Sequence, residues 1–129
     1  MRIKLSSIMV DDQDKALRFY TDVLGFKKKL DIPVGEYRWI TVESAESPHD
    51  LELSLEPNVN PAAKVFQKAM FDQGIPLTAF EVSDLPAEYR RLTGLGVAFT
   101  SEPAQHGPMM IAVLSDTCGN LIQLYQPPK

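Results

Sequence analysis

Hydrophobic and polar residues alternate along several short stretches of the chain, and two stretches between them repeat every three or four residues instead. Alternation is typical of strands with one buried face, and the longer period is typical of amphipathic helices. The first strand is predicted over residues 3–10. The helix that follows starts at Lys15, after the capping residues Asp11 and Asp12, and ends at Gly25. Three further strands are predicted at Lys28–Ile32, Tyr37–Glu43 and Asp50–Glu56.

The same order of elements returns in the second half of the chain. Residues 57–61 (PNVNP) form the clearest linker between the two halves of the chain. A helix is predicted after it, from Ala62 to Asp72, and Gly74 ends this helix. The second set consists of a strand over 76–82, a helix capped by Ser83 and Asp84, and strands at Val97–Thr100, Met109–Leu114 and Asn120–Tyr125.

Two matches between the halves support a repeat. Residues 8–12 match residues 80–84 at an offset of 72, and residues 24–26 match 95–97 at an offset of 71. The second helix is therefore one residue shorter. Self-similarity of this kind predicts two supersecondary units that share one core. We expect a single α+β domain over residues 1–129, with βαβββ modules at about 1–57 and 75–126 and a linker helix at about 61–74.

Composition narrows the classes of function. With 129 residues, 44% hydrophobic and 23% charged, the chain fits an ordinary globular domain. The net charge of −4 argues against a nucleic-acid partner, and the basic run Lys27–Lys29 is predicted to be a solvated strand edge. No stretch resembles a leader or a membrane span, and the single cysteine, Cys118, gives no disulfide framework. A cytoplasmic protein without a membrane partner is expected.

Two motifs resemble one known family. Residues 10–26 (VDDQDKALRFYTDVLGF) resemble the opening signature of the vicinal oxygen chelate superfamily, which includes glyoxalase I, extradiol dioxygenases, and fosfomycin and bleomycin resistance proteins. Residues 116–124 (DTCGNLIQL) resemble its closing hairpin, with Thr117 where proline is common. The resemblance implies the glyoxalase/bleomycin resistance fold: two βαβββ modules whose mixed sheets curl into a cup, with helices outside and a ligand inside.

Strand parity indicates which side chains would line such a cup. Between Asp50 and Glu56 the odd positions are leucine and the even positions polar, so the polar side chains are expected to face the ligand. In Tyr37–Glu43 the same rule assigns Thr41 to the cup, together with two aromatic residues. The predicted ligand-binding residues are Tyr37, Trp39, Asp50, Glu52, Ser54, Gln123 and Tyr125.

The resemblance also identifies where a metal would be held. Metal-dependent members take one ligand, usually His or Glu, from each of four strands. The corresponding positions here hold Leu5, Glu52, Leu77 and Gln123. Leucine has no donor atom, and one carboxylate with one amide makes a poor site for a divalent transition metal. His49 and His106 are expected in loops away from the strand centres. No metal or other cofactor is expected.

The leading hypothesis is a binding protein similar to the metal-free bleomycin resistance proteins, which are homodimers. Carboxylates beside aromatic rings suit a small aromatic or cationic molecule. One alternative is a metal-independent isomerase or lyase with Glu52 as general base. Another is a metal-dependent enzyme of the glyoxalase or dioxygenase type with an atypical site. The sequence does not decide whether the protein is an enzyme, although the missing metal ligands favour a binder. It also leaves open whether the modules pair within a chain or between chains.

Overall fold

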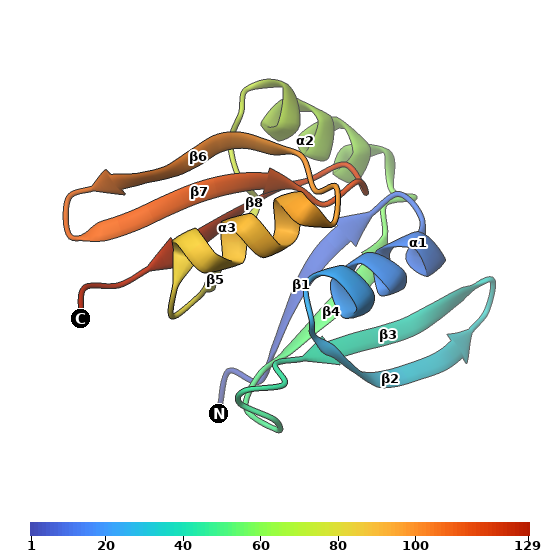
Figure 1. The fold of residues 1–129 in the computed structure, drawn as a ribbon. Coiled ribbons are helices and arrows are strands. Elements are labelled where there is room, and N and C mark those ends of the chain that lie inside the picture. The colour runs from blue at the N-terminus through green and yellow to red at the C-terminus, as the bar shows by residue number, and fades with distance from the viewer. The chain divides into compact units, whose positions relative to one another are not determined.

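The computed structural model describes residues 1–129 and divides into two compact units, Met1–Phe66 and Gln67–Lys129 (Figure 1). The first unit contains β1 (Leu5–Val10), α1 (Gln13–Arg18), the π-helical turn η1 (Phe19–Val23), β2 (Lys27–Val34), β3 (Tyr37–Glu43) and β4 (Glu52–Pro57). Helix α2 (Pro61–Asp72) begins in the first unit and ends in the second. The second unit contains β5 (Thr78–Glu81), α3 (Leu85–Gly94), β6 (Phe99–His106), β7 (Met109–Ser115) and β8 (Leu121–Gln126).

Both units have the same sheet topology. The strand orders are β1-β4-β3-β2 and β5-β8-β7-β6. In each sheet the first strand pairs in parallel with the last, and the other neighbours are antiparallel. A crossover helix is what allows a parallel pair to form within a short segment. The α+β fold of two βαβββ units predicted from the sequence is therefore confirmed. No helix is long and apolar enough to cross a membrane.

A π-helical turn accounts for the extra residue in the first helix. The N-caps correspond, because the side chains of Asp12 and Asp84 each accept a hydrogen bond from a backbone N–H three residues on, at 3.0 Å. The ends correspond too, because Gly25 and Gly96 have φ of +91° and +87°. The first helix must fit one more residue between equivalent ends, and the turn Phe19–Val23 absorbs it, as π-bulges do.

Some predicted element boundaries were wrong. Strand β4 begins at Glu52 rather than Asp50, so Leu51 lies before the strand and is 51% exposed instead of buried. Strand β6 runs to His106, which pairs with Met109 and does not lie in a loop. The segment after Phe99 shows no alternation because β6 is an exposed edge strand with two register irregularities, held by backbone pairing to β7.

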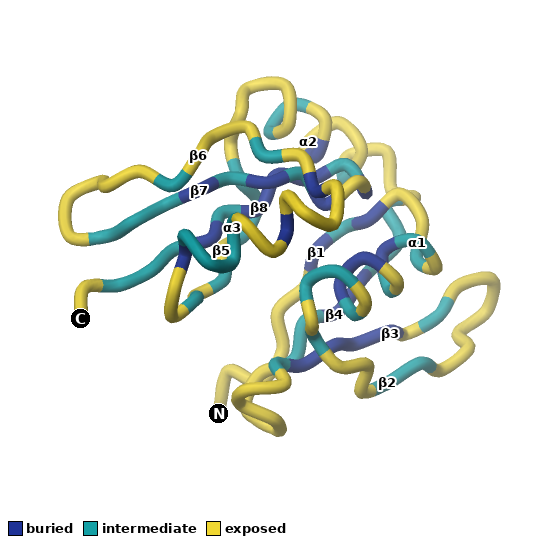
Figure 2. The backbone as a smooth tube through the Cα atoms, viewed as in Figure 1, coloured by how far each residue is buried: buried dark blue, intermediate teal, exposed yellow.

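Each sheet packs one face against one helix, and the opposite face is called its open face below. Helix α1 packs on β3 and β4, and α3 packs on β6, β7 and β8. Figure 2 shows the buried residues mostly in the inner strands, with the edge strands β2 and β6 largely exposed. The side chains that form the two cores are Val10, Ala16, Tyr20, Ile40, Val42 and Leu55 in the first unit, and Leu85, Leu92, Ala112, Leu114, Ile122 and Leu124 in the second.

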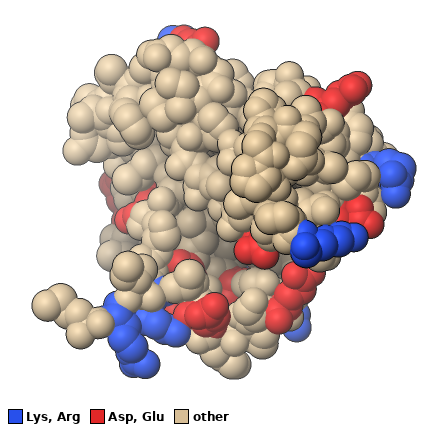
Figure 3. All heavy atoms as spheres, turned by 90° about the vertical axis from the view of Figure 1, so that its left-hand side faces the viewer, with Lys and Arg blue, Asp and Glu red and all other residues tan.

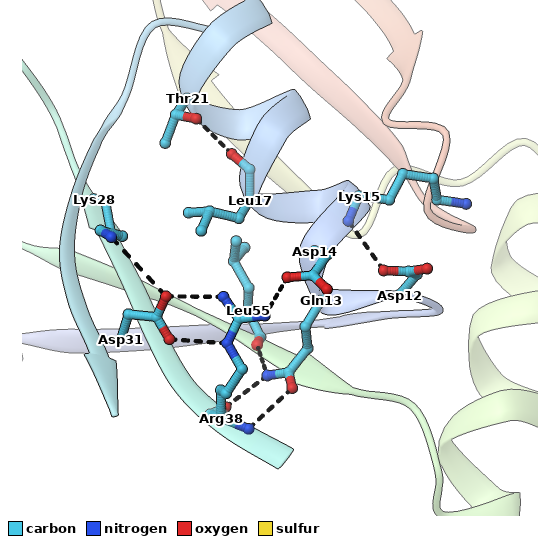
Figure 4. A network of polar contacts seen from close by, with 10 residues as sticks. All are labelled: Asp12, Gln13, Asp14, Lys15, Leu17, Thr21, Lys28, Asp31, Arg38 and Leu55. Atoms are coloured by element: carbon cyan, nitrogen blue, oxygen red, sulfur yellow. Dashed lines mark hydrogen bonds and ion pairs between the residues drawn. The ribbon is translucent and has the colours of Figure 1, made fainter. Parts of the chain in front are cut away.

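A polar network fastens α1 to the first sheet (Figure 4). The β3–β4 pairing ends at Thr41 and Ser54, and beyond it the amide of Gln13 bridges the two strands. Its nitrogen donates to the carbonyls of Arg38 (2.6 Å) and Leu55 (2.9 Å), and its oxygen accepts from the Arg38 N–H (3.1 Å). The side chain thus satisfies three backbone groups where the strand ladder stops.

Arg38 continues this network to the edge strand. Its guanidinium donates to both oxygens of Asp31 on β2, at 2.9 and 2.8 Å, and to Asp14 on α1. The bidentate pair matches the planar fork of arginine to a carboxylate. The hydrogen bonds from Arg38 hold the pKa of Asp31 below its usual value. One guanidinium therefore ties together β2, β3 and the first turn of α1.

Replacing Asp31 by asparagine should lower the free energy of unfolding by about 1 kcal/mol at pH 7, the scale of a partly exposed charged hydrogen bond. Because the folded-state pKa of Asp31 is lowered, its contribution is complete above the unfolded value near 3.8 and disappears as the pH falls through the folded value. Urea denaturation at several pH values should show the two proteins converging below about pH 4. The control is Glu36→Gln, an exposed carboxylate in the turn after β2; an equal loss there would contradict the assignment.

The closing hairpin is held by a buried set of hydrogen bonds. Asp116 accepts from the N–H groups of Cys118 (2.7 Å) and Asn120 (3.0 Å), and the Asn120 amide donates to its second oxygen at 2.7 Å. From α2, the Gln67 amide donates to the Cys118 carbonyl at 3.2 Å and to the Asn120 side chain at 3.0 Å. Gly119 lies beneath it with φ of +98°, where a Cβ would be 2.9 Å from the Gln67 amide. The motif thus depends on a glycine for both conformation and space.

Gly119→Ala should destabilise the protein more than Gly96→Ala. Both glycines have a left-handed φ, but a Cβ at Gly96 would meet nothing within 4 Å. The Gly96 variant should therefore lose about 1 kcal/mol from backbone strain alone, and the Gly119 variant roughly 1 kcal/mol more from crowding Gln67. Thermal or urea unfolding measures both. Equal losses would show that Gln67 moves aside without cost.

Candidate functional site

The open face of the first sheet carries a group of large apolar side chains. On β3, Tyr37 and Trp39 point away from the α1 side, where Ile40 and Val42 are buried, and they are 40% and 43% exposed. Their partners on β2 are Val34 and Ile32, which are also exposed. We call Ile32, Val34, Tyr37 and Trp39 the aromatic patch. Neighbouring exposed apolar residues of this size are typical of binding surfaces.

A charged cluster lies further along the same face. Glu43 on β3 and Glu52 on β4 are directly paired in register, so their side chains leave the sheet side by side. The Lys29 ammonium lies 3.7 Å from Glu43 Oε2 and 3.5 Å from Glu52 Oε2. We call Lys29, Glu43 and Glu52 the charged cluster. Its two carboxylates share one cation from the chain.

Each carboxylate also accepts a hydrogen bond from a group other than Lys29. The Thr41 hydroxyl, which is fully buried, donates to Glu52 Oε1 at 2.7 Å. The backbone N–H of His49 donates to Glu43 Oε2 at 3.1 Å. This hydrogen bond is the main cause that lowers the pKa of Glu43; against the raising effect of burial, a charge on His49, whose Nδ1 lies 3.8 Å from Glu43 Oε2, and the charge of Lys29 act in the same direction. Glu43 is therefore ionised at neutral pH although it is only 8% exposed.

The aromatic patch and the charged cluster lie within the span of one small molecule. Trp39, Thr41 and Glu43 are alternate residues of β3, so Trp39 is about 7 Å along the strand from the threonine that holds Glu52. Thr41 and Ser54, which are directly opposite each other and buried, lie between the patch and the cluster. The arrangement offers a flat apolar surface next to fixed negative charge.

The structure brings together four of the residues predicted from the sequence: Tyr37, Trp39, Glu52 and Ser54 share the open face of the first sheet. Asp50 lies in the exposed turn before β4 and not within the strand. Gln123 and Tyr125 lie on β8 in the second unit, on the face opposite the buried Ile122 and Leu124, and the Tyr125 hydroxyl donates to Glu81 at 3.5 Å.

Sequence reasoning missed Lys29 and Glu43. Glu43 has the parity of Trp39 and Thr41, so the alternation of β3 could have identified it. Lys29 could not be found in that way. The register of β2 shifts between Lys28 and Leu30, and this bulge turns Lys29 towards the carboxylates. The lysine run lies on the exposed edge strand β2, as predicted, but the sequence did not show that Lys29 also contacts the two carboxylates.

The four positions that hold a metal in related proteins do not form a metal site here. Leu5 and Leu77 have no donor atoms, and the oxygens of Glu52 are engaged by Thr41 and Lys29. Nowhere does the structure gather three or more His, Cys, Asp or Glu side chains in a way that could hold a metal ion. The donor set thus does not fit the divalent metal of the enzymes with this fold.

The remaining charges are dispersed. Figure 3 shows the Lys and Arg side chains of one face in separate places with acidic side chains nearby, and they do not merge into one basic patch. Several are paired locally, as Lys15 is with Asp11 and Lys68 with Asp72. The charged cluster differs from these pairs because its carboxylates are mostly covered.

Comparisons with known proteins agree with this fold. A profile of the Glyoxalase/Bleomycin resistance protein/Dioxygenase superfamily matches residues 2–124. The chain belongs to this superfamily. The protein named Uncharacterized protein YurT of Bacillus subtilis (strain 168) is 54% identical over 126 residues, which are 98% of this chain and 99% of that protein.

Two solved structures of the superfamily fold are similar over nearly their full length. UcmS2 superposes with a TM-score of 0.83 at 32% identity, covering 97% of each chain. TnmS3, an antibiotic binding protein from Streptomyces sp. CB03234, superposes with a TM-score of 0.75 at 28% identity, covering 98% of this chain and 96% of its own. One of the proteins that this chain resembles in structure is thus described as binding an antibiotic.

Lys29→Met should raise the pKa of Glu43 but leave it below its usual value, because the His49 N–H remains the larger cause of the lowering. Stability linked to Glu43 is fully present above the unfolded value near 4.5 and is lost as the pH falls through the folded one, so in the variant the loss should be smaller and should be complete at a higher pH. NMR titration of the side-chain carboxyl carbons measures the shift. Lys28→Met, which removes the same charge from the same strand but from the face that α1 covers, should leave Glu43 unchanged; a shift of equal size in both variants would contradict the contact.

Proposed function

We propose that the protein binds a small aromatic or cationic organic molecule on the open face of its first sheet. The observation that carries the proposal is the aromatic patch beside two anchored carboxylates on that face. An aromatic ring can stack on Trp39 or Tyr37, and a positive group can approach Glu43 and Glu52. The similarity to TnmS3, an antibiotic binding protein, supports a role in binding.

The geometry favours binding over catalysis by Glu52. A general base needs an oxygen that can accept a proton from a substrate, within hydrogen-bond reach. One oxygen of Glu52 accepts the Thr41 hydroxyl and the other faces Lys29. These contacts hold the carboxylate in place and leave neither oxygen without a partner from the chain. We therefore assign Glu52 to ligand recognition.

Other parts of the proposal rest on the family resemblance. Three further residues remain predicted ligand-binding residues: Asp50, which lies just before β4, and Gln123 and Tyr125, which lie on β8. The homodimer and the cytoplasmic location also remain predictions.

The chain's single tryptophan makes the site directly observable. Because Trp39 lies in the aromatic patch, a compound that binds there should quench its fluorescence saturably. Glu52→Gln should weaken binding of cationic aromatic compounds by roughly tenfold, the scale of one charge-assisted contact, and change the binding of neutral ones little. Calorimetry on each variant gives the affinities.

Glu36→Gln is the matched control, since it removes one carboxylate next to Tyr37 but outside the open face. It should bind both classes of compound as the wild type does. If a broad set of aromatic compounds, cationic and neutral, gives no saturable signal, the proposed function is wrong.

A further inference from the structure

Lys29 occupies the position that the positive group of a ligand would take. Its ammonium lies between Glu43 and Glu52 at 3.7 and 3.5 Å. Both distances exceed those of a good charge-assisted hydrogen bond, and the side chain is one-third exposed. Contacts of this length hold the ammonium less firmly than a short, aligned hydrogen bond would. Lysine is also a strongly hydrated point charge on a flexible stem, so it can leave at low cost.

The carboxylates would keep their places if Lys29 left. Glu52 is held by the buried Thr41 hydroxyl at 2.7 Å, and Glu43 by the His49 N–H at 3.1 Å. Both contacts come from groups that do not depend on the lysine. However, two carboxylates directly opposite each other on adjacent strands repel, so a cation must remain between them. The cluster is thus built to hold a cation, and the chain supplies one.

Resting on the proposed function, we infer that Lys29 is a built-in competitor that sets the charge specificity of the site. A ligand reaches the two carboxylates by displacing the lysine ammonium. A flat ring that carries an amidinium or guanidinium is the ligand class that does this best. Its planar fork of N–H donors matches carboxylates and is less strongly hydrated than an ammonium. Its ring would lie towards Trp39, about 7 Å from Thr41 along β3.

Two probes of the same shape separate charge from stacking: naphthalene-2-carboxamidine, which is cationic, and naphthalene-2-carboxamide, which is neutral. Calorimetry should give an affinity for the amidine that is at least tenfold higher in Lys29→Met than in the wild type. The affinity for the amide should not change. Lys28→Met has the same net charge and lies on the opposite face of β2, so it should bind both probes as the wild type does. This control separates local competition from the overall field of the protein.

Lys29→Arg tests the inference while keeping a positively charged side chain beside the two carboxylates. Arginine should hold the carboxylates more firmly, so the amidine should bind several-fold more weakly than to the wild type, while the amide is unaffected. The inference is overturned if the wild type binds the amidine and neither Lys29 variant changes that affinity, or if Lys29→Met weakens it. If neither probe binds to any of the proteins, the proposed function itself fails.

Discussion

Glu43 and Glu52 lie directly opposite each other on neighbouring strands, and the open face of the first sheet depends on how the repulsion between their charges is compensated. Like charges in direct cross-strand register destabilise a sheet unless other groups compensate them. Three groups do so here: the Thr41 hydroxyl, the His49 N–H and the Lys29 ammonium. Each comes from a different element of the local structure. The bulge in β2, the turn before β4 and the buried middle of β3 are therefore linked through one small cluster.

The opposite face of the same sheet uses a second polar system for a different purpose. There the Gln13 amide completes the hydrogen bonding of β3 and β4 where their ladder ends, and Arg38 joins both to the edge strand. Fixing α1 on this side covers the apolar residues of β3 and leaves the alternate ones, including Trp39, exposed. Because α1 covers one face of the sheet, only the opposite face is left for the proposed ligand.

The cluster also explains how a fold associated with metal chemistry can serve without the metal ligands. At the position where related enzymes hold a ligating glutamate, Glu52 is retained, but its neighbours are a threonine and a lysine instead of further donors. A carboxylate held next to exposed aromatic rings is the arrangement on which the proposed binding of an organic cation rests, and that binding would require no metal.

The sequence by itself determined the βαβββ repeat, the capped helices, and the face on which Tyr37, Trp39, Glu52 and Ser54 lie. It could do so because strand parity, N-cap residues and glycines with left-handed φ are local properties that leave a pattern in the chain. It also located the extra residue of the first helix, although only the structure shows the π-helical turn that absorbs it.

Only the tertiary structure decided which residues surround Glu52. The bulge that directs Lys29 to the carboxylates arises from how β2 pairs with β3, and a shift of one residue reverses the face of every side chain beyond it. The start of β4 at Glu52, which leaves Asp50 and Leu51 outside the strand, likewise follows from a turn whose His49 N–H is bonded to Glu43. Such contacts join residues distant in sequence, and no local pattern encodes them.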